Sequence, residues 1–255
     1  MHFGWTPDTP DFRDFTYQVT KPIALPPVTD LRSKMPVVYD QGDLGSCTAN
    51  AIAAAFEYEQ IHDGLADFMP SRLFIYFNER RMEGTVNSDA GAMIRDGIKS
   101  VNKDGVCSEI EWPYHVKSFA KQPPAKAYLD ARFHCSLQYQ RVTRTLYTMK
   151  HCLASGHPFT FGFMVYDSFE SDAVAKSGIV PMPRHDEEAL GGHAVLAVGY
   201  DDPTQHFIVR NSWGVGWGLQ GYFFMPYAYL LDTNLSDDFW TISKVGSSKS
   251  EIYDG

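Results

Sequence analysis

One cysteine stands at the start of a stretch whose composition strongly favours a buried helix. Residues 49–55 include five alanines, which have high helix propensity and let neighbouring segments approach closely, while Ile52 and Phe56 add apolar bulk. Cys47 would lie at the N-terminus of this helix, where unpaired backbone N–H groups and partial positive charge favour a thiolate. The sequence therefore predicts a central helix over residues 47–61 with a reactive thiol at its beginning.

Composition limits the classes of partner that suit this chain. At 255 residues with 44% hydrophobic residues, it can bury a substantial core without disulfides. Its net charge of −9, with no basic cluster longer than Arg80-Arg81, argues against nucleic acids and anionic membranes as partners. No signal peptide and no membrane-spanning run is apparent, so we expect a cytoplasmic protein or one exported by a signal-independent route.

The positions of the prolines and of the apolar residues divide the chain into parts. Residues 1–36 hold six of the fifteen prolines and are predicted to be extended. Apolar periodicity predicts helices that start near Ser71 and span residues 91–103. After Pro123-Pro124 the pattern becomes mainly strand-like, which indicates an α+β fold with a helical part followed by a β-rich part. The predicted elements there are a helix at 145–154 and strands at 136–142, 159–165, 193–200, 206–211 and 221–225.

Two later residues could complete a nucleophilic site with Cys47. An imidazole beside a thiol can take its proton, and a neutral amide can orient that imidazole without removing its charge. His193 begins an apolar strand, and Asn211 precedes a Ser-Trp-Gly sequence. Taken singly, each has a plainer interpretation: a buried cysteine, a core histidine and a turn-capping asparagine.

The order Cys47, His193, Asn211, with Gln41 six residues before the cysteine, resembles the papain-like cysteine peptidases. The similarity is concentrated in residues 37–60, 88–114 and 157–225. It implies a papain-like two-lobed fold with a cleft between the lobes. The implied parts are a helical lobe at about 37–125, a β-barrel-like lobe at about 130–225 and a closing segment at 226–255.

The resemblance also implies an activity and its machinery. Cys47 would attack a peptide carbonyl, His193 would act as acid and base, and Asn211 would orient the imidazole, with no cofactor and with peptides or proteins as substrates. Gln41 and the Cys47 backbone N–H would donate to the oxyanion. The cleft would be lined by Gly91, Met93, Ile94, Gly162, Gly192, Trp213 and Trp217. Core packing is the alternative for Met93, Ile94 and the two tryptophans.

The chain departs from the family pattern at two positions near the cysteine. Leu44 stands where the family's bridging cysteine is usual, and Thr48 replaces an aromatic residue. We therefore expect a bacterial-type branch that lacks the active-site disulfide. Cys135 and Cys152 could pair or remain thiols. The His-Cys pairs at 134–135 and 151–152 lack a zinc-like spacing, so no metal is expected.

Residues 1–24 precede the part that resembles the family, which begins at about residue 25. This proline-rich extension could lie across the cleft and restrain access, or it could be a scaffold for the domain at 25–255. Two other functions remain open: an acyl transferase that uses the same thioester chemistry, and a peptide-binding protein with little turnover.

Overall fold

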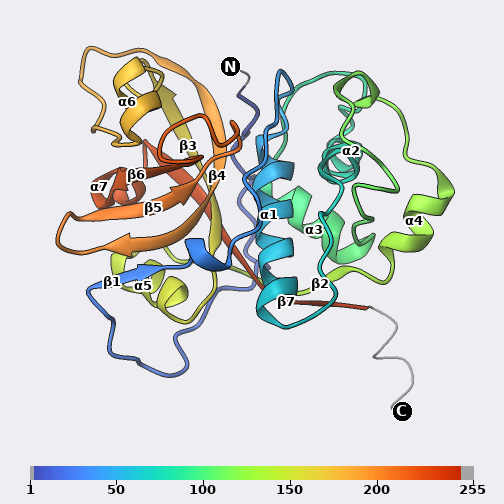
Figure 1. The fold of residues 1–255 in the computed structure, drawn as a ribbon, viewed down its shortest axis with the longest axis horizontal. Helices are drawn as coiled ribbons and strands as arrows, with labels where there is room; N and C mark the ends of the chain where they lie inside the picture. The colour runs from blue at the N-terminus through green and yellow to red at the C-terminus, as the bar shows by residue number, and fades with distance from the viewer. Residues whose placement is uncertain (1–2, 248–255) are drawn as a thin grey trace.

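The chain folds into a helical half and a half built on one antiparallel sheet, with helix α1 running between them (Figure 1). The computed structural model describes residues 3–247, so the outermost residues of the predicted N-terminal extension and closing segment lie outside the described part. In chain order the helices are η1 (Arg32–Lys34), α1 (Cys47–His62), α2 (Arg72–Glu83), α3 (Ile94–Lys103), η2 (Val116–Ser118), α4 (Ala125–Ala131), α5 (Leu146–Ala154), α6 (Asp172–Ser177) and α7 (Tyr227–Leu231).

Helix α1 is buried almost all round, as its small-residue sequence predicts. Every residue from Cys47 to Gln60 is buried. The helix packs on α2 and α3 on one side and on the sheet strands β4 and β7 on the other. Because alanines occupy much of its surface, the sheet can come close to the helix backbone, which brings the start of α1 next to β4.

The sheet has the strand order β2-β7-β3-β4-β5-β6, with β1 paired to β4 off this path. All of the strands predicted between residues 136 and 225 are present, and the strand that carries His193 is longer than predicted. Their bounds are β1 (Val28–Asp30), β2 (Cys135–Arg141), β3 (Phe159–Tyr166), β4 (Ala189–Asp201), β5 (His206–Arg210), β6 (Tyr222–Pro226) and β7 (Ser236–Gly246).

The predicted third helix starts later than expected. Helix α3 begins at Ile94 rather than at Gly91. Gly91 has a φ of +72°, and the Ala92 backbone pairs with Trp5 instead of entering the helix. The short elements α4, α6, α7 and β1 were not predicted, because a few residues carry too little periodicity to separate them from loops.

The N-terminal strap, defined here as residues 3–17, runs between the two halves (Figure 1, dark blue). Near its start, Trp5 N donates to Gly192 O in β4 at 2.9 Å, and Ala92 N donates to Gly4 O at 2.7 Å. Near its end, Tyr17 N donates to Arg141 O in β2 at 2.8 Å. The backbone of the strap is thus bound to both halves. The expectation of extended chain over residues 1–36 does not hold everywhere, because Asp14 N donates to Asp11 O in a turn and Arg32–Lys34 forms the 3-10 helix η1.

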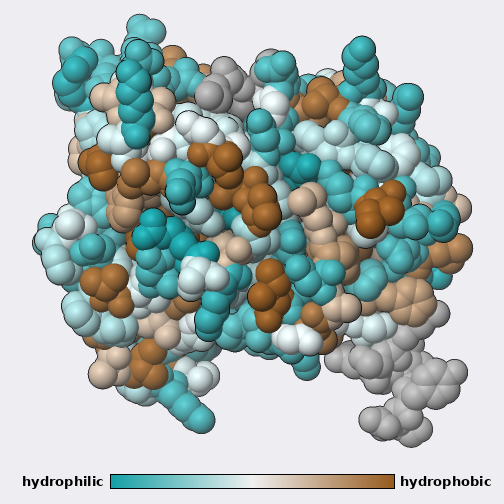
Figure 2. Space-filling view, viewed as in Figure 1, coloured by the Kyte–Doolittle hydropathy of each residue, from teal (hydrophilic) through white to brown (hydrophobic). Residues whose placement is uncertain are grey.

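Three further facts concern the surface, the helices and the cysteines. On the face seen in Figure 2, hydrophobic residues occur singly or in small groups among hydrophilic ones, and none of the helices described here is both long and apolar enough to cross a membrane. All four cysteines lie within residues 3–247, and none of them forms a disulfide.

A pair of glycines tests how tightly the helical half is packed. Gly84 and Gly105 have φ values of +74° and +77°, so an alanine at either costs about 1–2 kcal/mol in backbone strain. A Cβ at Gly105 would lie 1.7 Å from Ala131 O, whereas a Cβ at Gly84 would meet nothing within 4 Å. In urea denaturation, Gly105→Ala should therefore lose about 1–3 kcal/mol more unfolding free energy than the control Gly84→Ala. Equal losses would contradict this packing.

Candidate active site

His193 and Asn211 form a buried hydrogen bond at the centre of the site. His193 lies in β4, Asn211 directly follows β5, and Nε2 of the ring is 2.8 Å from Asn211 Oδ1. Asn211 Oδ1 also accepts from Ser212 N, so it acts as the acceptor and Nε2 as the donor. His193 Nδ1 is buried and has no hydrogen-bond partner among residues 3–247. The ring is therefore held in the tautomer that leaves Nδ1 able to accept a proton.

An aromatic cluster covers this hydrogen bond. The Trp213 ring stacks on His193 with 4.8 Å between centroids and 27° between planes. Trp217 packs edge-on against Trp213 at 5.1 Å. Both tryptophans are buried, so water is excluded from the His193–Asn211 contact.

Cys47 is the first residue of α1 and is fully buried. Its thiol contacts the backbone of Ala194, Gly4 and Thr48. Ala194 follows His193 in β4, so the structure brings Cys47 next to the strand that carries the histidine, although no hydrogen bond joins the thiol to His193 Nδ1. The strap, through Gly4, supplies one side of the thiol's enclosure.

Burial sets the charge state of the pair. It raises the pKa of the Cys47 thiol to about 12, although the backbone contacts of Ala194 and Gly4 act in the opposite direction. Burial also lowers the pKa of His193 to about 4, against the effect of its hydrogen bond to Asn211. In this arrangement burial disfavours the charged form of each group, because both are shielded from water.

Gln41 is buried in the loop before α1 and is fixed by that loop and by a serine. Ser212 Oγ donates to Gln41 Oε1 at 2.7 Å, and Gln41 Nε2 donates to Leu44 O at 2.9 Å. Gln41 N also donates to Ser212 O at 2.9 Å. The amide nitrogen is thus directed toward the loop that leads into Cys47. The orienting role of Ser212 was not predicted, because serine beside asparagine carries no distinctive pattern.

Three of the glycines predicted to line the cleft surround the start of the strap. A Cβ at Gly91 would lie 2.1 Å from Gly4 O, and Cβ atoms at Gly162 and Gly192 would lie 2.0 Å and 2.5 Å from Trp5 atoms. These positions therefore admit no side chain while the strap is bound. Two other predicted cleft residues lie nearby: Met93 precedes α3, and Ile94 is fully buried in the core.

Phe3 brings an aromatic ring from the strap against the histidine. Its centroid lies 6.3 Å from that of His193 and 6.4 Å from that of Trp213. Together with the backbone bonds of Gly4 and Trp5, this contact means that the strap touches the surroundings of both Cys47 and His193.

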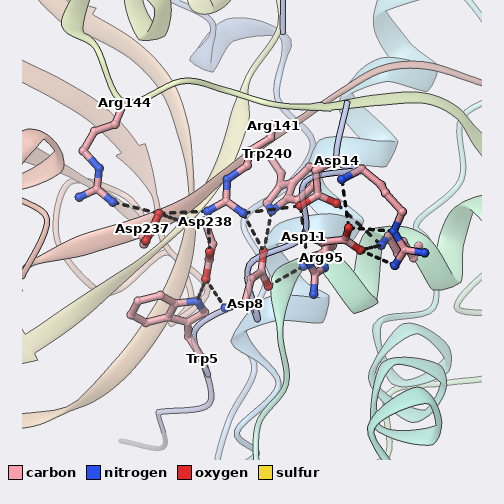
Figure 3. Close-up of polar contacts among 12 residues, drawn as sticks. Trp5, Asp8, Asp11, Asp14, Arg95, Arg141, Arg144, Asp237, Asp238 and Trp240 are labelled. Atoms are coloured by element: carbon pink, nitrogen blue, oxygen red, sulfur yellow. Dashed lines mark hydrogen bonds and ion pairs between the residues drawn. The ribbon is translucent and has the colours of Figure 1, made fainter. Parts of the chain in front are cut away.

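A buried network of charges anchors the strap farther along (Figure 3). Asp8 accepts hydrogen bonds from Trp240 Nε1 at 2.8 Å and from the backbone N of Arg95 at 3.1 Å. Asp14 pairs with Arg95 at 3.3 Å and lies 3.8 Å from Arg141, in β2. Sequence reasoning missed this network, because acidic residues in a proline-rich segment look like solvated turn residues.

No group of three or more His, Cys, Asp or Glu side chains suited to a metal ion occurs within residues 3–247.

Comparison with known proteins places this geometry in a family. Residues 25–234 match the sequence profile described as papain family cysteine protease. An uncharacterized peptidase C1-like protein of Acanthamoeba polyphaga mimivirus is 45% identical, over 96% of this chain and 87% of that protein. Pro-cathepsin H of Bos taurus is 30% identical over 78% of this chain, which spans only 59% of that relative.

A solved structure agrees with the sequence comparisons. Xylellain, a cysteine protease from Xylella fastidiosa, has a TM-score of 0.85 and 46% identity, with 96% of each chain covered. The predicted papain-like α+β fold, with a helical domain and an antiparallel β-sheet domain, is thereby confirmed. The chain belongs to the papain family of cysteine proteases.

Proposed function

We propose that this cysteine protease hydrolyses peptide bonds with Cys47 as nucleophile, His193 as acid and base, and Asn211 as the residue that orients the imidazole. The observation that carries the proposal is the 2.8 Å bond from His193 Nε2 to Asn211 Oδ1, which leaves Nδ1 as the only ring atom able to take the thiol proton. Cys47 stands at a helix N-terminus beside the same strand, where backbone N–H groups can support a thiolate.

The chemical steps follow from these groups. The thiol proton passes to His193 Nδ1, and the sulfur attacks the substrate carbonyl. The imidazolium then protonates the leaving amine, and water hydrolyses the thioester with the imidazole as base. Gln41, held by Ser212 and Leu44, and the Cys47 backbone N–H are the proposed donors to the oxyanion.

We also propose that the strap restrains the protease by occupying the substrate cleft. In support, Gly4 and Trp5 form backbone bonds with Ala92 and Gly192, on opposite sides of the site, in the manner of a bound extended peptide. Because burial holds both Cys47 and His193 uncharged, displacement of the strap would admit water and favour the reactive ion pair.

Replacing the nucleophile tests the catalytic assignment. Cys47→Ala should lower kcat/KM toward fluorogenic peptides by at least about a thousandfold and abolish labelling by an epoxysuccinyl thiol reagent. Cys152→Ala, which removes a buried thiol from helix α5, should retain activity. Turnover retained by Cys47→Ala would refute the assignment, and product masses measured with an added amine distinguish hydrolysis from acyl transfer.

A single added methyl group tests the restraint. A Cβ at Gly4 would lie 1.8 Å from Gly45 O, so Gly4→Ala prevents the strap from seating, at a cost of about 1–3 kcal/mol. If docking limits access, this variant of the full chain should have a kcat/KM about 5- to 150-fold higher than wild type. Phe12→Ala changes a strap side chain that is 99% exposed and should leave kcat/KM unchanged. An unchanged kcat/KM in Gly4→Ala would favour a scaffolding role.

The anchor of the strap is expected to respond to pH. Burial and then the nearby Asp238 carboxylate raise the pKa of Asp8 to about 7, while Trp240, the backbone N of Arg95 and Arg141 oppose the rise. In a released strap the carboxyl would return toward its ordinary pKa of 3.8. The docked state therefore holds a proton that the released state loses between these two values. Docking should weaken as pH rises from about 4 to about 7, by up to about tenfold per pH unit.

The pH effect can be measured by labelling Cys47 with a thiol reagent. Asp8→Asn keeps the uncharged form at all pH values, and the thiol's own ionisation cancels in the ratio of wild-type to variant labelling rates. This ratio should rise between pH 4 and 7 and become constant above. A ratio that is flat across this range would contradict the role of Asp8.

A further inference from the structure

A tyrosine of the helical half contacts both ends of the loop that leads into Cys47. Tyr114 lies shortly before η2, and its hydroxyl donates to Gln41 O at 2.9 Å. The same hydroxyl is 2.5 Å from Ser46 Oγ. Because the hydroxyl has one proton and gives it to Gln41 O, it accepts from Ser46 Oγ. Tyr114 thus joins the residue that carries one proposed oxyanion donor to the residue directly before the other.

Ser46 is fixed in turn by the first turn of α1. The buried Asn50 donates through Nδ2 to Ser46 Oγ at 3.0 Å and to Ser46 O at 2.9 Å. Asn50 Oδ1 accepts from Nη1 of Arg72, in α2, at 3.3 Å. The hydrogen bonds therefore all run in one direction, from Arg72 at one end to Gln41 O at the other. Successive hydrogen bonds of this kind polarise one another, which strengthens each of them.

Arg72 also holds the tyrosine itself in place. Its guanidinium lies 4.1 Å from the centroid of the Tyr114 ring, and its Nη2 pairs with Glu109 Oε1 at 2.7 Å. Tyr114 N donates to the same Glu109 oxygen at 3.1 Å. Burial raises the pKa of the Tyr114 hydroxyl, although the contacts with Ser46 and Arg72 act in the opposite direction. The hydroxyl therefore keeps its proton at neutral pH and remains the donor to Gln41 O.

The loop between Gln41 and Ser46 has no covalent link that would fix its shape. Leu44 stands where the family's bridging cysteine is usual, and the four cysteines, all within residues 3–247, are free. Two of the four residues inside the loop are glycines, which give a chain more conformational freedom than other residues do. Polar contacts from outside the loop must therefore keep Gln41 at a constant distance from the start of α1.

Resting on the proposed function, we infer that Tyr114 is a positioning residue for the oxyanion, whose hydroxyl sets the separation between Gln41 and the backbone N–H of Cys47. Two donors stabilise one oxyanion only when both lie within hydrogen-bond distance of the same point, and a displacement of about 1 Å can cost about a hundredfold in rate. Ser212 holds the Gln41 amide from the sheet half, and Tyr114 holds the Gln41 backbone from the helical half.

Removal of one hydroxyl group tests this role. Full-chain Tyr114→Phe keeps the ring that packs on Arg72, and it should lower kcat toward peptide amides by about 10- to 100-fold, with KM within about twofold of wild type. Iodoacetamide alkylates Cys47 at a saturated carbon and forms no oxyanion, so its reaction rate should stay within about twofold. An unchanged kcat, or an equal loss of the alkylation rate, would overturn the inference.

A second tyrosine of the helical half provides the matched control. Tyr128 is also partly buried, and its hydroxyl donates to Asn78 Oδ1 at 2.8 Å, with no printed contact to the loop before α1. Tyr128→Phe should therefore leave kcat unchanged. If Tyr114→Phe does not fold, Ser46→Ala removes the other side of the same link and takes its place, with the same expected results and the same contrary ones.

Coupling to Gln41 separates positioning from a general loss of stability. In a Gln41→Ala background the side-chain donor is already absent, so Tyr114→Phe should lower kcat by a factor about 2-fold or more smaller than it does in wild type. Equal losses in the two backgrounds would show that Tyr114 does not act through Gln41 and would overturn the inference.

Hydrogen–deuterium exchange tests the link without any need for catalysis. Residues 41–47 should take up deuterium faster in Tyr114→Phe than in wild type, whereas β3 (Phe159–Tyr166) should exchange at the same rate. Unchanged exchange in residues 41–47 would overturn the inference. Faster exchange there, in a chain whose wild type hydrolyses no peptide, would support the role of Tyr114 in holding the loop and overturn the proposed function instead.

Discussion

Exclusion of water from the junction between the start of α1 and strand β4 is the constraint on which the site depends. The alanine-rich surface of α1 lets β4 approach closely enough for the Cys47 thiol to contact the Ala194 backbone. Trp213 seals the other side by stacking on His193. The same enclosure that fixes the imidazole on Asn211 also disfavours charge on the thiol and the ring. The side chains are therefore well placed when the site is enclosed, but their reactive charged forms require access to water.

We propose that the strap accounts for this difference. Its first residues approach the site mainly through backbone, and they can do so because Gly4 and Gly91 have no side chains to keep the two segments apart. Its later residues are held by buried carboxyl groups, with Asp8 and Asp14 reaching partners from both halves of the molecule. One segment therefore has a close contact at the thiol and, farther along, anchors that respond to protonation. A mutation can change the contact or the anchors separately.

Local features of the sequence were sufficient to predict much of this arrangement. The helix at Cys47 depends on its own composition, and the assignment of His193 and Asn211 depends on their order relative to the cysteine, so both could be read without knowing the tertiary structure. The helix expected from Gly91 was wrong at its start, because Ala92 pairs with Trp5, which lies 87 positions earlier in the chain. No local sequence pattern indicates a contact between residues so far apart in the chain.

The same limit explains what was missed at the site. The expectation of a thiolate rested on the helix terminus and the imidazole, whereas the charge state also depends on solvent access. We propose that the strap controls this access. Asp238 was treated only as part of a closing strand, because its partners Trp5 and Asp8 lie at the other end of the chain. Its left-handed backbone is likewise visible only in the structure.

We propose that the thiol at the start of α1 becomes reactive when the strap leaves it. Hydrogen–deuterium exchange of the full chain before and after reaction with an epoxysuccinyl peptide, with the adduct located by mass spectrometry, measures both events on one molecule. We predict an adduct on Cys47 together with increased deuterium uptake across residues 3–17. An adduct on Cys47 with unchanged exchange in the strap, or an adduct on another cysteine, would contradict it.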